Sequence, residues 1–169
     1  MAKILMVVAP KDYRDEELFI PKEIFENEGH QVVIASTKIG ALTGVRGGRI
    51  TSELLLSDIN TDDYDAVVFV GGGGSKVLFN NPQALRIAQE TNERHKVVAA
   101  ICIAPVILAN AGVLKNKQAT VFNSEIKALK SKGAKYTPQG VAADGNIITG
   151  DSPENAGLFA KKICELLKK

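Results

Sequence analysis

Tryptophan is absent from the 169 residues of the chain, and aromatic residues make up only 5% of it. This scarcity disfavours a binding platform for single-stranded nucleic acid, which stacks bases on aromatic side chains. The chain also lacks a dense basic stretch, because 21 Lys and Arg residues are nearly balanced by 19 Asp and Glu residues. Nucleic-acid-binding proteins usually concentrate positive charge in a stripe or patch. We therefore expect no nucleic-acid partner.

Long apolar runs are missing as well. No stretch approaches the roughly 18 apolar residues needed to cross a membrane. The apolar segment at residues 4–9 lacks the flanks and the cleavage site of a signal peptide, so we interpret it as a strand. We expect no membrane partner and a cytoplasmic location.

Cysteine and histidine are both scarce, with two residues of each type. Cys102 and Cys164 lie far apart, and a single disulfide would not persist in a reducing compartment. His30 and His95 are too few to complete a conventional structural zinc site. The phosphate-loop and dinucleotide-binding patterns are also absent. We expect no metal and no cofactor.

What is present is the composition of an ordinary globular protein, with 45% hydrophobic and 24% charged residues. The length suits one domain, and we predict a single domain over residues 1–169. Apolar runs of strand length occur at residues 4–9, 31–36, 65–70, 97–101 and 147–149, and a further short strand is expected at residues 119–122. Helical patterns lie between and after them, at residues 15–28, 82–94, 105–111, 124–132 and 153–167. This alternation predicts an α/β fold with a parallel sheet and helices on both faces. A small hairpin is expected within residues 40–56.

The most informative segment ends the fourth buried strand. Cys102 follows five small or apolar residues, and Pro105 begins a helix almost at once. A cysteine on such a sharp turn has the placement of a nucleophile elbow. The N-terminus of a helix stabilises an anion, so we expect the pKa of the Cys102 thiol to lie below its free value of about 8.5. The alternative is a small buried hydrophobic residue, which is how we interpret Cys164 in the last helix.

A second feature is the run of four glycines, residues 71–74, directly after the third strand. Backbone N–H groups of Gly72 or Gly73, together with that of Ile103, would form an oxyanion hole beside Cys102. The alternative is a flexible loop. Glu17, by itself, has only the character of a solvated residue at an acidic helix start.

These segments together resemble the ThiJ/PfpI superfamily, which includes PfpI-type intracellular protease homologues and the Parkinson-disease protein deglycase type. The resemblance covers almost the whole chain. It rests on Glu17-Leu18-Phe19-Ile20-Pro21, Gly71-Gly72, Ala99-Ala100-Ile101-Cys102-Ile103-Ala104-Pro105 and Asp144-Gly145-Asn146-Ile147-Ile148-Thr149. It implies a flavodoxin-like three-layer sandwich, similar to class I glutamine amidotransferases, and assembly into homodimers or rings of dimers. It also implies that a protonated Glu17 approaches Cys102.

The chain departs from the family at several positions. Protease-like members carry a histidine directly after the cysteine, where this chain has Ile103, and take an acidic residue from a neighbouring subunit, where this chain has Ser75-Lys76. Deglycase and glyoxalase-like members use a later histidine, and residues 119–123 contain none. Relatives often carry a Ser-Arg or similar pair before a late proline, and the corresponding residues 150–153 of this chain, Gly-Asp-Ser-Pro, contain no arginine. His30 and His95 precede strands, so we expect both at the opposite end of the sheet from Cys102.

Three functions follow as hypotheses. The first is a weak glyoxalase- or deglycase-like enzyme in which Cys102 attacks a small reactive carbonyl and Glu17 shuttles a proton. The second is a cysteine redox sensor or stress-protective protein, whose partner is an oxidant. The third is a cysteine peptidase or amidase, which the missing histidine disfavours. A small-ligand-binding module built on the glycine run is a further alternative.

Overall fold

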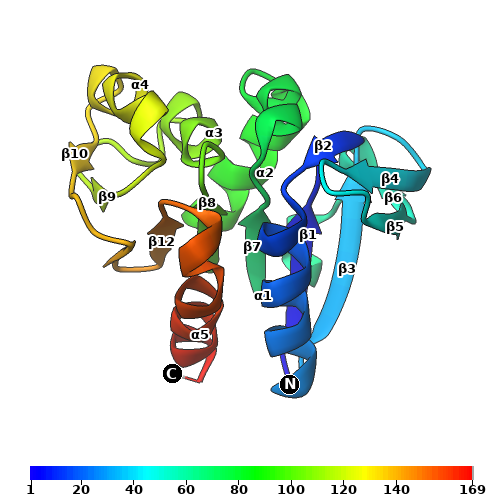
Figure 1. The fold of residues 1–169 in the computed structure, drawn as a ribbon. Helices are drawn as coiled ribbons and strands as arrows, with labels where there is room; N and C mark the ends of the chain where they lie inside the picture. Colours follow the sequence, from blue (N-terminus) through cyan, green and yellow to red (C-terminus); the bar gives the residue numbers. More distant parts are fainter. Residues whose placement is uncertain (169) are drawn as a thin grey trace.

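The structure is a computed structural model that describes residues 1–168, and its centre is a seven-stranded sheet (Figure 1). The strand order is β11-β12-β8-β7-β1-β3-β6. The strands are β1 (Lys3–Val7), β3 (Gln31–Ser36), β6 (Leu54–Leu55), β7 (Ala66–Phe69), β8 (Val97–Ile101), β11 (Val141–Asp144) and β12 (Ile147–Gly150). All neighbours pair in parallel except β11, which pairs antiparallel with β12 at one edge. The predicted α/β fold with a mostly parallel sheet is confirmed.

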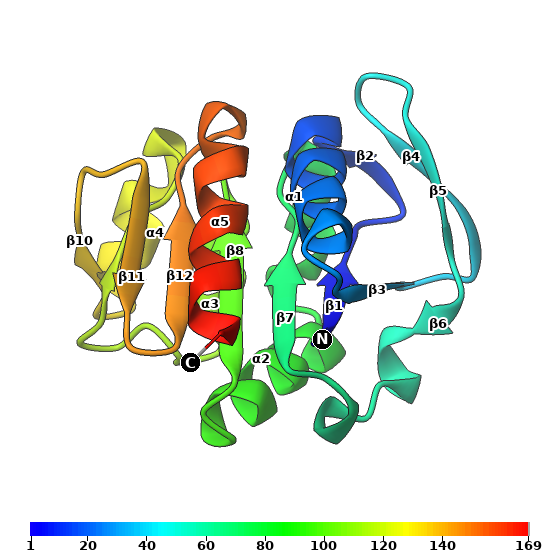
Figure 2. The same cartoon turned by 90° about the horizontal axis from the view of Figure 1, so that it is seen from below.

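Helices cover both faces of this sheet, as Figure 2 shows. On one face lie α1 (Asp15–Asn27) and α5 (Ala156–Leu167), side by side; on the other lie α2 (Pro82–Glu93), α3 (Pro105–Asn110) and α4 (Ile126–Ser131). Short 3-10 helices occupy Leu56–Asp58, Thr61–Asp63, Gly73–Leu78, Asn123–Glu125 and Pro153–Asn155. The result is the expected flavodoxin-like three-layer sandwich. Among residues 1–168, no helix is both long and apolar enough to cross a membrane.

The buried strands serve two cores at once. In β1, Ile4 and Met6 pack under α1 and α5, whereas Leu5 and Val7 pack under α2 and α3. All four side chains are fully buried. Because successive side chains of a strand point to opposite faces, a strand covered on both sides must be apolar at every position. This requirement explains the continuous apolar runs of the sequence.

Two smaller sheets flank the main one. β2 (Lys11–Tyr13), β4 (Gly40–Gly44) and β5 (Arg49–Ser52) form a three-stranded sheet, and β9 (Gln118–Ala119) pairs with β10 (Lys135–Tyr136). The antiparallel pair of β4 and β5 confirms the hairpin predicted within residues 40–56. The strand expected at residues 119–122 is shorter than predicted. β9 ends at Ala119, and beyond it the Phe122 N–H donates a hydrogen bond to the Cys102 carbonyl, 2.8 Å away.

The carboxyl ends of the parallel strands gather several loops at one edge of the sheet. Hydrogen bonds tie these loops together: the Arg14 N–H donates to the Gly71 carbonyl over 3.0 Å, and the Cys102 N–H donates to the Gly150 carbonyl over 2.9 Å. Ligand sites in open α/β sheets lie at this edge.

Candidate active site

Cys102 stands on a sharp turn between β8 and α3. Its φ of +65° lies in the left-handed region, which costs a residue other than glycine about 1–3 kcal/mol. Hydrogen bonds on both sides hold the turn, from its own N–H to Gly150 and from Phe122 to its carbonyl. The residue is 9% exposed, enough for its thiol to meet a small reactant. The geometry is that of the predicted nucleophile elbow.

Glu17 is fully buried in the first turn of α1, beneath the Cys102 turn. The three acidic residues that open α1 differ in orientation, and only Glu17 points into the protein. Neither carboxyl oxygen has a partner with full hydrogen-bond geometry among residues 1–168. The Cys102 thiol and the Gly71 N–H nevertheless lie close enough to affect its ionisation. The structure thus brings together the two residues that the family resemblance paired.

Their ionisation is coupled. Burial raises the pKa of Glu17 to about 8, an effect that the Cys102 thiol, as a hydrogen-bond donor, partly offsets. Burial, followed by the repulsion and hydrogen bonding of the Glu17 carboxylate, raises the pKa of Cys102 to about 12. In a pair this close, each proton loss belongs to both groups. Near neutral pH the pair is largely uncharged, and the carboxyl is the group that ionises first.

The expectation of a lowered Cys102 pKa is therefore wrong. The N–H groups of Ile103 and Gly72 do stabilise the thiolate, as the helix N-terminus argument assumed. Their contribution is smaller than the cost of desolvating the thiolate beside a carboxylate. The sequence pattern revealed the favourable amides but not the depth of burial.

The glycine run allows a close approach of the backbone to this pair. A Cβ atom at Gly71 would overlap the Glu17 carboxyl and lie 2.8 Å from the Cys102 Cβ. Gly72 has a φ of +101°, which favours glycine, and its N–H faces the Cys102 sulfur. Gly73 lines the cavity in front of the sulfur. All three predicted oxyanion-hole residues thus lie beside Cys102, and their role in catalysis stays a prediction.

A cavity of about 300 Å³ opens in front of Cys102. Its wall is formed by Arg14, Val45, Gly72, Gly73, Lys76, Cys102, Ile103, Phe122, Ser124 and Pro153. No histidine and no carboxylate is among these lining residues. The cavity can admit a molecule of a few heavy atoms, and it presents two cations and several apolar side chains to it.

The tip of the hairpin forms one wall of this cavity because acidic residues of α1 hold it. The Asp15 carboxylate accepts hydrogen bonds from the N–H of Arg46 over 2.9 Å and from the N–H of Gly48 over 2.7 Å. The Val45 N–H donates to the Tyr13 carbonyl over 2.9 Å. These bonds place the Val45 side chain at the cavity. Asp15 is therefore a positioning residue for the site.

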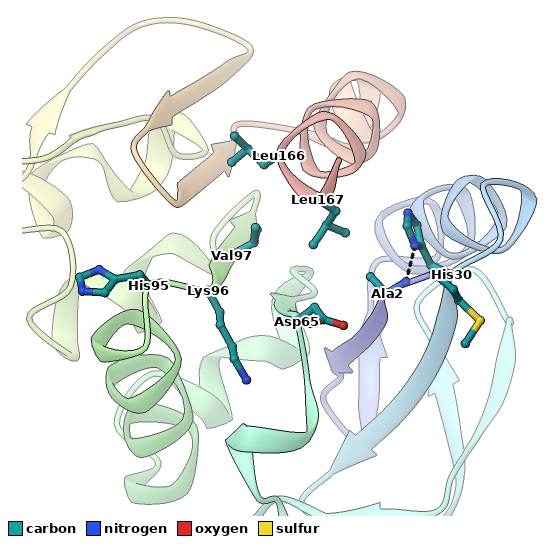
Figure 3. Close-up of a pocket in the computed structure, with 9 residues that line it drawn as sticks. Ala2, His30, Asp65, His95, Lys96, Val97, Leu166 and Leu167 are labelled. Atoms are coloured by element: carbon teal, nitrogen blue, oxygen red, sulfur yellow. Dashed lines mark hydrogen bonds between the residues drawn. The ribbon is translucent and has the colours of Figure 1, made fainter. Parts of the chain in front are cut away.

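The two histidines lie far from this site, as predicted. His30 and His95 line a different cavity, of about 330 Å³, at the amino edge of the sheet (Figure 3). Val97, the first residue of β8, lines the same cavity, whereas Cys102 follows the opposite end of that strand. His30 accepts a hydrogen bond from the Ala2 N–H over 2.9 Å. Neither histidine can serve Cys102 as a base within this chain.

Metal ligands do not gather in the part of the chain that the structure describes. Residues 1–168 contain no group of three or more His, Cys, Asp or Glu side chains able to hold a metal ion. Cys164 is 2% exposed, packs in the core under α5, and has a pKa raised by burial. It matches the structural interpretation given to it above.

Six residues that line the cavity were not predicted from the sequence as site residues: Arg14, Val45, Lys76, Phe122, Ser124 and Pro153. Val45 and Phe122 reach the cavity only through tertiary hydrogen bonds, which leave no local signal. Arg14 had a weak signal, as a single cation directly before three acidic residues.

Comparison with known proteins identifies the family of the chain. The model of the DJ-1/PfpI family matches residues 2–166. The chain is 48% identical over 171 residues to the protein MJ0967 of Methanocaldococcus jannaschii, covering 99% of this chain and 83% of that one. It is 32% identical over 166 residues to deglycase PfpI of Pyrococcus furiosus, covering 98% and 99%.

A crystal structure of a ThiJ/PfpI domain protein from Brachyspira murdochii superimposes with a TM-score of 0.97 at 32% identity, covering 98% of this chain and 96% of that one. Further relatives are named deglycase or putative cysteine protease. The chain belongs to the DJ-1/PfpI family.

Proposed function

We propose that the protein is a weak, cysteine-dependent enzyme that acts on small reactive carbonyl compounds, in the manner of a glyoxalase or deglycase. The observation that carries the proposal is the pairing of Cys102, which stands on a strained turn and lines a small cavity, with the buried Glu17 behind it. Relatives named deglycase support it. The proposal needs no histidine, which fits the composition of the cavity wall.

Glu17 is the proposed base. With a pKa of about 8, a useful fraction of Glu17 is ionised at neutral pH, while the thiol keeps its proton. The carboxylate takes that proton as the Cys102 sulfur adds to the aldehyde carbon of a 2-oxoaldehyde. The S–C bond forms, the C=O π electrons move onto oxygen, and Glu17 returns the proton there to give a hemithioacetal. The N–H groups of Gly72, Gly73 and Ile103 stabilise the developing oxyanion.

The reaction then completes without an external oxidant. Glu17 removes the proton from the former aldehyde carbon, which gives an enediolate, and returns it to the neighbouring carbon, while the hydroxyl proton of the first carbon passes to the oxygen of the second. The first carbon is thereby oxidised and the second reduced. The product is a thioester of a 2-hydroxy acid on Cys102. Water cleaves the thioester and restores the thiol, so the net change is addition of one water. A missing histidine base typically costs about 10²–10⁴ in rate, so slow turnover is expected.

The test is methylglyoxal consumption with product identification. Wild type should form lactate, with a rate that rises as pH increases through about 8, where Glu17 ionises. Cys102→Ala should abolish the reaction, and Glu17→Gln should lower it about 10²–10⁴-fold. The exposed Glu23→Gln on the same helix is the matched control and should keep wild-type activity. Unchanged consumption in Cys102→Ala would overturn the proposal.

A redox role is the second candidate, because Cys102 is partly accessible and Glu17 can donate a proton to an oxidised sulfur. A peroxide would transfer one oxygen to the sulfur and leave as water. The raised pKa of Cys102 disfavours rapid oxidation at neutral pH, since the thiolate is the reactive form. Mass spectrometry after mild peroxide treatment would favour this role if Cys102 alone gains oxygen while methylglyoxal is not consumed. The peptidase alternative lacks an imidazole base in the cavity wall.

We also propose that the chain self-associates, as the family resemblance led us to expect. Exposed apolar side chains support this: Ile39 is 56%, Val45 57% and Val77 60% exposed. Light scattering coupled to size exclusion should give at least twice the 18.1 kDa of one chain. A mass of one chain at micromolar concentration would contradict self-association.

A further inference from the structure

The charges around the Cys102 cavity suggest which carbonyl compounds it accepts. Arg14 and Lys76 are the charged side chains among its lining residues, and no lining residue is acidic. The side chain of the proposed base, Glu17, lies behind the cysteine rather than in the wall. An anionic group entering the cavity would therefore meet two cationic side chains in the cavity wall and no carboxylate there.

Arg14 is held in place for such a contact. Its guanidinium forms paired hydrogen bonds with the Glu16 carboxylate, at 3.2 and 2.9 Å. These hydrogen bonds are the largest cause of the raised pKa of Arg14. The charge of Cys102 raises this pKa as well, so Arg14 lies within electrostatic range of the sulfur. Glu16 also pairs with Arg46 over 3.3 Å, so its single negative charge is shared between Arg14 and Arg46.

Lys76 is the second cation, and it is not engaged elsewhere. Its ammonium group has no ion pair within 4 Å among the described residues 1–168, and the residue is exposed at the rim of the cavity. It stands in the 3-10 helix Gly73–Leu78, which begins within the glycine run. A lysine on a flexible stem can reach an anion that enters the cavity.

Apolar side chains complete the wall. Val45 comes from the hairpin tip, Phe122 follows β9, and Pro153 begins the segment before α5. Phe122 is 39% exposed and Val45 57% exposed, so both present apolar surface to whatever binds. The cavity combines a cationic side with an apolar side at a nucleophile.

We propose that the Cys102 cavity selects carbonyl compounds that carry a carboxylate, through Arg14 and Lys76, over neutral ones of the same size. The choice of a carbonyl rests on the proposed function; the preference for an anion does not. For a carboxylate-bearing aldehyde, the Cys102 sulfur forms the S–C bond, the carbonyl π electrons move to oxygen, and Glu17 transfers the thiol proton to that oxygen. The substrate carboxylate stays bound to the two cations throughout.

The preference can be measured without any enzymatic turnover. Iodoacetate and iodoacetamide are matched in size and alkylate the same sulfur by loss of iodide, and they differ in one negative charge. At Cys102, the rate constant for iodoacetate is divided by the rate constant for iodoacetamide. This ratio, relative to the same ratio for free cysteine, reports the charge recognition. We expect this relative ratio to be about 3–10 at low salt, as for a partly exposed ion pair, and to fall towards one with added salt.

Lys76→Gln should lower the relative ratio by at least half, and Arg14→Gln should lower it further. Lys127→Gln, an exposed lysine on α4 outside the cavity, is the matched control and should leave it unchanged. A variant that merely loosens the site would change both rate constants together and leave their ratio intact. A wild-type ratio equal to that of free cysteine would overturn the inference, whether or not methylglyoxal is consumed. Loss of carbonyl turnover with the ratio preserved would refute the proposed function alone.

Discussion

Replacing Glu17 by glutamine should make the protein more stable at alkaline pH, relative to wild type. The substitution keeps the shape of the protonated side chain and removes its ability to ionise. In the folded state the pKa of Glu17 is about 8, whereas an unfolded glutamate titrates near 4.5. Because the folded pKa is the higher one, the stability that this group confers is complete below about 4.5 and is lost as pH rises towards 8. The glutamine of the variant does not titrate, so the variant cannot lose stability in this way.

The magnitude follows from the separation of the two pKa values. Each unit is worth about 1.4 kcal/mol, so wild type loses about 3–4 kcal/mol through this group between about pH 5 and pH 8. For a chain of this length, about 1 kcal/mol corresponds to roughly 2–4 °C in Tm. The Tm of Glu17→Gln minus that of wild type should therefore grow by roughly 5–15 °C over this range.

The assay is thermal or urea unfolding of both proteins at several pH values. Glu23→Gln serves as the control, because Glu23 is exposed on the same helix. Taking differences between variant and wild type removes the contribution of every other titrating group. A difference that stays constant from about pH 5 to pH 8 would refute the burial and coupling assigned to Glu17.

Three further predictions concern the surroundings of the site. Gly71→Ala should slow alkylation of Cys102 and destabilise the protein by about 1–3 kcal/mol, because the new Cβ has no room; mass spectrometry and urea unfolding measure the two effects. Asp15→Ala should lower the free energy of unfolding by about 1–3 kcal/mol and speed hydrogen exchange at the Gly48 amide, which loses its acceptor; unchanged exchange would contradict the role of Asp15 in holding the hairpin tip. Cys164 should stay unalkylated in the folded protein under conditions that label Cys102, since it is 2% exposed, and peptide mapping would show any exception.

Much of the fold could be predicted because its physical causes are local. The continuous apolar runs of β1, β7 and β8 reflect burial on both faces, and this pattern is visible in the sequence alone. The two-residue strands β6 and β10 were not visible in this way, and the bounds of β9 were predicted incorrectly. They are too short to show a period, and they exist only through their partners in the sheet.

The site was only partly predictable. The turn at Cys102 is encoded locally, by small residues before it and Pro105 after it. The approach of Glu17 is a tertiary contact, which the residues alone did not indicate and the family resemblance supplied. The direction of the Cys102 pKa was predicted wrongly, because desolvation and a buried carboxylate depend on packing that no motif records.

Glu17 and Cys102 ionise as one coupled pair, and following the ionisation of the thiol is the direct test of this coupling. The ultraviolet absorbance of the thiolate should be followed against pH in Cys164→Ala and in Cys164→Ala with Glu17→Gln, so that Cys102 is the remaining thiol. Without the repelling carboxylate, Cys102 should ionise at a lower pH than the value of about 12 in the presence of Glu17. Ionisation of Cys102 at the same or a higher pH in the Glu17→Gln protein would contradict the pairing.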